Sequence, residues 1–254
     1  MSINSFKKIK NKLYVFRRGV INIFKYPKMV TGGTVDYDAY WKDKRGDKIG
    51  SLSDWQILRA EMAKEIILSN KIVDEKEIVL SDIGCGDGNI LNYLKNKIED
   101  LEIKMVGVDI SEFALKKAEE FGVQTIKEDI TNKDFISKFP EADYTIMFEI
   151  LEHIPHSEEF LKNAYKVSKK GVMFSFPNTG YVTHRTRLLF GSFPLQWRLS
   201  PGEHLRYWTL RDLKWWLKEQ DYKNYEIKTY KGIPILNKIF PSLFAAAFFV
   251  FIRK

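Results

Sequence analysis

A glycine-rich turn between an apolar run and an amphipathic segment constrains the fold of this chain most strongly. Residues 78–80 are Ile-Val-Leu, and Gly84, Gly86 and Gly88 precede the amphipathic segment 90–94. This order is typical of a strand, a tight turn and a helix. A helix that begins at such a turn presents free backbone N–H groups to an anionic or polar ligand. The pattern favours a nucleotide-like ligand over the alternative, a purely structural turn.

Apolar runs and helical patterns alternate along the rest of the chain. The predicted strands cover residues 103–109, 123–126, 144–148, 171–176, 225–230 and 244–252. Strands that alternate with helices are typical of a parallel sheet with right-handed crossovers. The sequence therefore predicts an α/β fold with a doubly wound, Rossmann-like sheet, whose ligands lie at the carboxyl ends of the strands.

Acidic residues gather at these predicted strand ends, namely Asp82, Asp109, Asp129 and Glu149. A carboxylate at the end of the second strand, as Asp109 is, can accept hydrogen bonds from both hydroxyls of a ribose. That feature alone also fits NAD. The spacing Gly84-x-Gly86-x-Gly88 is tighter than the dinucleotide motif, and no third spaced glycine is present for a pyrophosphate.

Three motifs in this order resemble the class I S-adenosylmethionine-dependent methyltransferases. They are Asp82–Gly88, Val108–Ser111 and Phe148–Ile154, and the resemblance covers roughly residues 55–252. It implies a seven-stranded sheet with a reversed last hairpin and S-adenosylmethionine as the cofactor. We therefore expect a methyltransferase domain over residues 53–254 and an N-terminal helical extension over residues 1–52.

The same resemblance implies the cofactor-binding residues. These are Asp82, Gly84, Cys85, Gly86, Gly88, Asp109, Ile110, Asp129, Ile130, Phe148 and Glu149. The glycines would line the methionine part, with Asp82 near its amino group. Asp109 would bind the ribose, Ile110 would pack on the adenine, and Asp129 would face the adenine amine.

A long segment over residues 177–208 interrupts the alternation and is expected to cap the substrate. A connection of this length in a compact domain is usually functional. The predicted substrate-binding residues are Tyr40, Arg185, Arg206 and Tyr207. Arginines suit an anionic acceptor, and solvated surface charge is the alternative. Residues 175–178 and 204–209 resemble the MetW-like and glycan-pathway small-molecule methyltransferases.

Three histidines are candidate bases for a hydroxyl acceptor. Methyl transfer is an in-line displacement, so the enzyme mainly aligns donor and acceptor, and a base removes the proton of an attacking hydroxyl. His153 follows the fourth strand and is the first candidate, with His184 and His204 as alternatives. The competing interpretation is that His153 packs beneath the cofactor loop.

The segment Glu149-Ile150-Leu151-Glu152-His153 also resembles the metal-binding pattern of ubiquinone-pathway and small-RNA 2′-O-methyltransferases. By that resemblance Glu149, Glu152 and His153, with His156 or His204, would hold a divalent ion that activates a hydroxyl. Metal-free relatives carry the same five letters. The sequence therefore predicts no metal.

The basic character of the chain belongs to its N-terminal segment. Residues 1–35 hold eight Lys or Arg and no Asp or Glu, whereas the remainder holds 33 residues of each sign, for a net charge of +8. Apolar residues recur every three or four positions over residues 3–24, which predicts a basic amphipathic helix. Such a helix can lie on an anionic membrane surface or dock on the domain. Because the rest of the chain is neutral, a nucleic-acid interface is not favoured.

The sequence thus predicts a methyltransferase that acts by O-methylation on a small or glycan-like, anionic or lipid-linked acceptor. The single Cys85 suits a reducing compartment, and we expect a cytoplasmic protein that contacts the inner membrane surface peripherally. The alternatives are an RNA methyltransferase and a non-catalytic S-adenosylmethionine-binding module, with a NAD-dependent dehydrogenase more distant.

Overall fold

The computed structural model describes residues 23–26, 36–45, 50–196 and 203–254 of the 254-residue chain. Most of the predicted amphipathic helix over residues 3–24 lies outside the described residues; residues 23 and 24, at its end, are helical. None of the described helices is long and apolar enough to span a bilayer.

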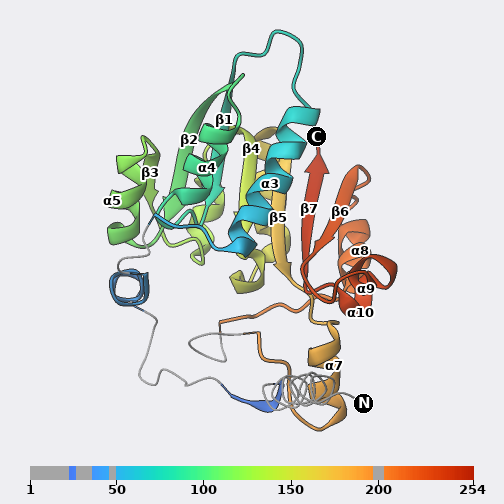
Figure 1. Cartoon of the computed structure of the whole chain (residues 1–254). Helices are drawn as coiled ribbons and strands as arrows, with labels where there is room; N and C mark the ends of the chain where they lie inside the picture. Colours follow the sequence, from blue (N-terminus) through green and yellow to red (C-terminus); the bar gives the residue numbers. More distant parts are fainter. Residues whose placement is uncertain (1–22, 27–35, 46–49, 197–202) are drawn as a thin grey trace, which may run out of the picture.

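A seven-stranded sheet forms the centre of the molecule, in the order β3-β2-β1-β4-β5-β7-β6 (Figure 1). The strands are β1 (Glu77–Ile83), β2 (Glu102–Asp109), β3 (Gln124–Lys127), β4 (Ala142–Phe148), β5 (Ser168–Pro177), β6 (Tyr225–Tyr230) and β7 (Ala247–Arg253). The strands β1 to β5 pair in parallel, and β7 runs antiparallel to both β5 and β6. This confirms the predicted doubly wound sheet with a reversed last hairpin.

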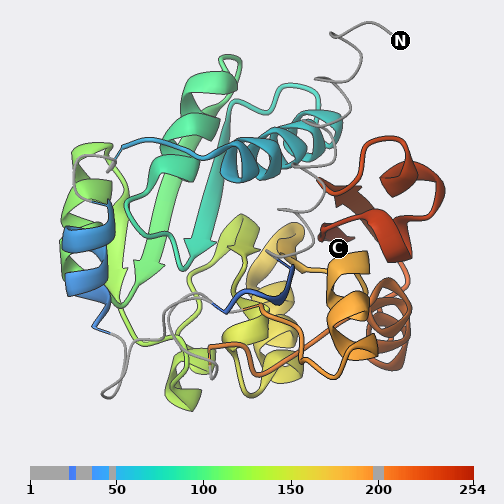
Figure 2. The same ribbon diagram turned by 60° about the horizontal axis from the view of Figure 1, so that its bottom comes forward.

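Helices cover both faces of the sheet (Figure 2). They are α2 (Tyr37–Tyr40), α3 (Asp54–Ser69), α4 (Asn89–Lys97), α5 (Glu112–Glu120), α6 (Ser157–Val167), α7 (Val182–Leu189), α8 (Leu210–Glu219), α9 (Leu236–Ile239) and α10 (Pro241–Phe244), with short η helices at Trp41–Arg45, Lys133–Ser137 and Leu151–His153. Capping boxes begin α3 at Ser53 and α8 at Thr209. In each, the side chain of the capping residue and that of the third helical residue satisfy free backbone N–H groups reciprocally.

Two hydrophobic cores fill the space between the sheet and these helices. One contains buried side chains of α3, α4 and α5, such as Ile67, Leu91 and Leu115. The other contains side chains of α6 and α8, such as Phe160 and Trp216. Buried strands contribute to both cores because successive side chains point to opposite faces of the sheet.

The insertion at residues 177–208 is closed at its base. Asn178 and Trp208 form an isolated bridge, and the backbone N–H of Thr179 donates to the Trp208 carbonyl at 3.0 Å. Between these ends the chain forms α7, a helix that the sequence analysis did not predict. The described part of the insertion and α2 lie at the carboxyl ends of the parallel strands (Figure 1), which is where a doubly wound sheet binds ligands.

Candidate active site

The glycine-rich turn between β1 and α4 follows a path that side chains would block. Gly84 and Gly86 have φ angles of 78° and 54°, in the left-handed region that glycine tolerates. A Cβ atom on Gly84 would collide with the side chain of Ile150, and one on Gly86 would collide with the ring of Trp41. The turn therefore lets other groups approach its backbone closely, as the predicted cofactor site requires.

Asp109 joins the end of β2 to this turn. Its carboxylate accepts hydrogen bonds from the backbone N–H of Gly86 at 2.8 Å and of Ser111 at 2.9 Å. Burial raises the pKa of Asp109, and these two N–H groups oppose the shift. Ile110, next to it, is 40% exposed at the same edge. Asp129 is exposed, and its carboxylate accepts from the backbone and hydroxyl of Thr131.

Asp82 is a buried carboxyl group near the end of β1. Burial raises its pKa to about 8, the charge of Asp109 adds to this, and Arg59 opposes it. Arg59 comes from α3 and forms an ion pair with Glu149 at 3.0 Å. Nothing in the local sequence distinguishes Arg59 from the other polar residues of its helix, and the sequence analysis missed it.

Glu149 follows β4 in a conformation that is uncommon for a residue with a side chain, with φ of 59°. Its carboxylate accepts from the hydroxyls of Ser175 at 2.9 Å and Tyr230 at 3.4 Å, and it pairs with Arg59. Contacts from three different elements hold the side chain in place. A strained backbone of this kind persists only where the surroundings fix it, and it is common at functional sites.

A cavity of about 710 Å³ opens beside Glu149, under the insertion. Its charged and imidazole side chains come from α3, the turn after β4, α7 and the segment that begins at residue 203. These residues are Arg59, Glu149, Glu152, His153, His184, Glu203 and His204. The structure thus brings all three predicted candidate bases, His153, His184 and His204, into one cavity next to the predicted cofactor site.

His153 is held in one tautomer. Its Nδ1 lies 2.5 Å from the carbonyl oxygen of Glu203. A carbonyl oxygen only accepts, so Nδ1 carries the proton and Nε2 keeps its lone pair. Burial lowers the pKa of His153, and the Glu203 carbonyl opposes this shift. A neutral imidazole with a free Nε2 is the form that a general base requires.

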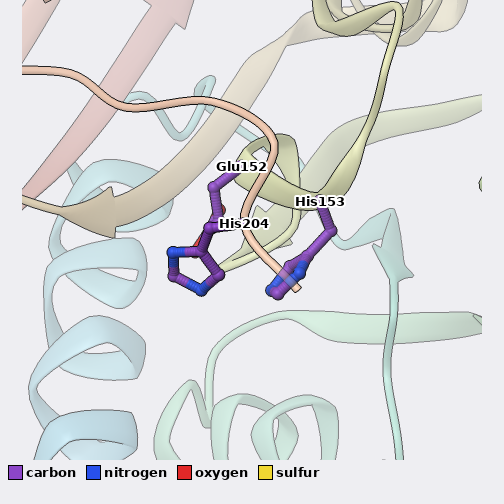
Figure 3. A group of neighbouring side chains, drawn as sticks. All are labelled: Glu152, His153 and His204. Atoms are coloured by element: carbon purple, nitrogen blue, oxygen red, sulfur yellow. The ribbon is translucent and has the colours of Figure 1, made fainter. Parts of the chain in front are cut away.

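Glu152 and His204 lie against His153 (Figure 3). The two imidazole rings meet edge to face, with centroids 4.7 Å apart. The backbone N–H groups of Leu205 and Arg206 donate to the Glu152 carbonyl at 2.8 and 3.1 Å, which fixes the segment that carries His204. Glu152 is 1% exposed, and neither oxygen of its carboxyl group has a hydrogen-bond partner in another described residue. Burial, followed by the charge of Glu149, raises its pKa well above the usual range.

His184 reaches the cavity from α7. Burial lowers its pKa to about 4, and the nearby charge of Arg187 adds to this shift. His184 is therefore neutral across the physiological pH range. Two neutral imidazoles, those of His153 and His184, and the buried carboxyl group of Glu152 thus line the space available to an acceptor.

The predicted substrate-binding residues lie outside the lining of this cavity. The Nε of Arg185 donates to the Gly180 carbonyl, and Arg206 binds the Pro155 carbonyl and Glu158. Tyr207 packs edge to face on Phe193, and Tyr40 on Trp41. These contacts give each of the four side chains a structural role within its own surroundings.

The segment that carries α2 contributes residues that the sequence analysis did not assign. Asp38 accepts from the Ser111 hydroxyl at 2.6 Å and from the Phe113 N–H at 3.0 Å, which docks α2 on the start of α5. Burial raises the pKa of Tyr37, and the charges of Glu203, Asp109 and Asp129 add to this. Tyr37 therefore lies within electrostatic range of Asp109, Asp129 and Glu203.

Comparison with known proteins agrees with this geometry. A family described as "Methyltransferase domain" matches residues 55–227, which is more than half of the chain. The chain belongs to this methyltransferase family. A search of curated proteins finds no match.

Solved methyltransferase structures share the fold. A SAM-dependent methyltransferase from Archaeoglobus fulgidus is 19% identical, with a TM-score of 0.56, over 87% of this chain and 100% of that one. Magnesium protoporphyrin IX methyltransferase from Synechocystis PCC 6803, with bound SAH, is 13% identical, with a TM-score of 0.54, over 86% and 98%. The plantazolicin methyltransferase BpumL, also with SAH, is 18% identical, with a TM-score of 0.53, over 85% and 93%. The family match, with neighbours solved in complex with SAM or SAH, supports S-adenosylmethionine as the cofactor.

Replacement of Asp82 by Asn tests the burial of its carboxyl group. The native pKa of Asp82 is about 8, against 3.8 for an ordinary Asp, so the folded protein keeps a proton that the unfolded chain loses. The contribution of this group to the free energy of unfolding is therefore fully present below pH 3.8 and is lost as pH rises toward about 8. The loss is up to about 1.4 kcal/mol per pH unit. Denaturant unfolding without cofactor should show a steeper fall for the wild type than for Asp82→Asn. If the free energy of unfolding fell equally with pH in the wild type and in Asp82→Asn, this account would be contradicted.

Proposed function

We propose that this methyltransferase transfers the methyl group of S-adenosylmethionine to a hydroxyl oxygen of a small or glycan-like acceptor held in the cavity. The observation that carries the proposal is the tautomer of His153: its imidazole is neutral, and Nε2 carries no proton. The residue lines a cavity beside the turn that implies the cofactor site. The acceptor class also takes support from the length of the insertion that covers the cavity.

The residues at the strand ends suit the cofactor. Asp82 is buried, and without a positively charged neighbour it keeps a proton. An ammonium group beside it would instead stabilise the ionised carboxylate. Asp109 would accept from the ribose hydroxyls, and Asp129 would face the adenine amine. Ile110, Ile130 and Phe148 would pack on the cofactor, and Cys85 and the glycines would border it.

The chemistry of the transfer requires little beyond alignment and one proton transfer. S-adenosylmethionine supplies a methyl group bound to a positively charged sulfur. As the acceptor oxygen bonds to the methyl carbon, the carbon–sulfur bond breaks and its electron pair stays on sulfur. His153 Nε2 takes the hydroxyl proton at the same time, which prevents positive charge from building up on the acceptor oxygen.

A lipid-linked acceptor fits the N-terminal segment. The basic, amphipathic pattern of residues 3–24 is typical of peripheral contact with an anionic membrane surface. We propose that the enzyme works in the cytoplasm at the inner membrane surface. The alternative of an RNA substrate requires strong RNA binding at low salt, where phosphate contacts are strongest, and the absence of such binding would exclude it.

Replacement of His153 by Ala tests its role as the base. We expect turnover to fall by about 10²- to 10⁴-fold while S-adenosylmethionine affinity stays unchanged, because the residue acts on the acceptor's proton. Transfer of labelled methyl groups into small-molecule and lipid extracts measures turnover, and calorimetry measures cofactor affinity. His156→Ala is the matched control, since His156 is exposed and outside the cavity lining. Equal turnover of both variants would contradict the assignment of His153 as the base. If the wild type bound the cofactor but transferred no methyl group, the non-catalytic binding module would be favoured.

A metal-assisted form of the same transfer is the second candidate. One carboxylate oxygen of Glu152 and one ring nitrogen each of His153 and His204 lie within 4.8 Å of one another. A carboxylate with two imidazoles suits a divalent transition metal, and the Glu152 carboxyl group is buried without a hydrogen-bond partner in another described residue. Such an ion would lower the pKa of an acceptor hydroxyl. In this form His153 would be a ligand rather than the base.

Titration with Mn²⁺ alone distinguishes the two forms. If the group holds a metal, calorimetry should give one bound ion per chain, and Glu152→Gln should weaken binding at least about tenfold because it removes the anionic ligand. His156→Ala should bind the ion as the wild type does. No binding to the wild type, or equal binding to Glu152→Gln, would contradict the metal-assisted form and leave His153 as the base.

A further inference from the structure

The end of α7 and the turn after it carry four large apolar side chains that are more than half exposed. Leu188, Leu189, Phe190 and Phe193 are 52%, 79%, 68% and 63% exposed. We call these four residues the apolar tip. Single exposed apolar residues are ordinary on a protein surface, but a cluster within six positions marks an interaction surface.

The backbone of the apolar tip is fixed by a buried arginine. Arg187 is 2% exposed, and its Nε donates to the Phe193 carbonyl at 2.7 Å. The Ser192 N–H donates to the Arg187 carbonyl at 2.7 Å. These hydrogen bonds close the turn after α7. The apolar side chains are therefore exposed on a turn that is already folded in the absence of a ligand.

The same arginine joins the N-terminal segment to the tip. The Nη1 of Arg187 donates to the Ile23 carbonyl, and its guanidinium lies over the ring of Tyr26 at 4.8 Å. Phe24 meets Phe190 edge to face at 5.8 Å. Ile23 to Tyr26 therefore lie beside the tip (Figure 1), so the basic segment that precedes them in the chain ends there.

The charge of both segments has one sign. Residues 1–35 contain no Asp or Glu, and neither do residues 178–202, which include α7 and the tip. Lys25 is exposed next to Tyr26. Exposed apolar side chains between basic segments are the pattern of a surface that inserts into the headgroup region of an anionic bilayer. Pairing of two copies through this surface would instead bring like charges together.

We propose that the apolar tip inserts into the surface of an anionic lipid bilayer, beside the basic N-terminal segment. His184 and Leu188 stand one turn apart on α7, and His184 lines the cavity. The tip therefore places the cavity close to the bilayer, where a lipid-linked acceptor can enter it. This consequence for the acceptor rests on the proposed methyl transfer, whereas the membrane contact itself does not.

Co-sedimentation of the full chain with vesicles tests the contact. The vesicles contain phosphatidylcholine, with or without phosphatidylglycerol. Leu188→Ser with Leu189→Ser should weaken binding to the anionic vesicles at least about tenfold, because both side chains lose apolar area to bury. Ile72→Ser with Val73→Ser is the matched control. These residues are 63% and 87% exposed in the turn between α3 and β1, at the opposite end of the molecule (Figure 1).

The proposal predicts wild-type binding to anionic vesicles, loss in the tip variant and retention in the control, with equal melting temperatures of all three. Lack of wild-type binding, or equal binding of the tip variant, would overturn it. A wild-type dimer in analytical ultracentrifugation that the tip variant abolishes would also overturn it, in favour of self-association. The assay contains neither cofactor nor acceptor, so its failure would leave the proposed methyl transfer standing.

Discussion

The burial of carboxyl groups at the strand ends is the constraint on which the site depends. Asp82 is 3% exposed and Glu152 is 1% exposed, and burial raises the pKa of both. A charged carboxylate without a partner is costly in such surroundings. Each group must therefore keep a proton or gain a positively charged neighbour. Arg59 lies among them, but its ion pair is with Glu149.

This constraint links the site to its cofactor. S-adenosylmethionine carries an ammonium group and a positively charged sulfur, and either suits a site that presents buried carboxyl groups. The glycine-rich turn supplies close backbone approach, and Asp109 holds that turn through the Gly86 N–H. On the acceptor side, the short helix Leu151–His153 follows β4 directly and presents Glu152 and His153 to the cavity. The two halves of the site thus meet at the end of one central strand.

The fold followed from the sequence because its signals are local. Apolar runs indicated the strands, and the glycine spacing with Asp109 indicated the cofactor edge. The helix α7 was missed because its segment is rich in Pro and Gly on both sides. The meeting of His204 with His153 depends on how the insertion folds back, and Arg59 faces the site through the packing of α3. The arginines predicted to bind substrate donate to nearby carbonyl groups and to Glu158, contacts that no local pattern indicates.

The most direct test of the central claim is the proton balance of cofactor binding. In the free protein Asp82 is protonated below about pH 8, and a cation placed beside it lowers its pKa and releases the proton. Calorimetry of S-adenosylmethionine binding near neutral pH, in buffers of different ionisation enthalpy, should therefore show proton release by the wild type. Asp82→Asn should bind S-adenosylmethionine more weakly and release fewer protons. Equal affinity and equal proton release in both proteins would contradict the account.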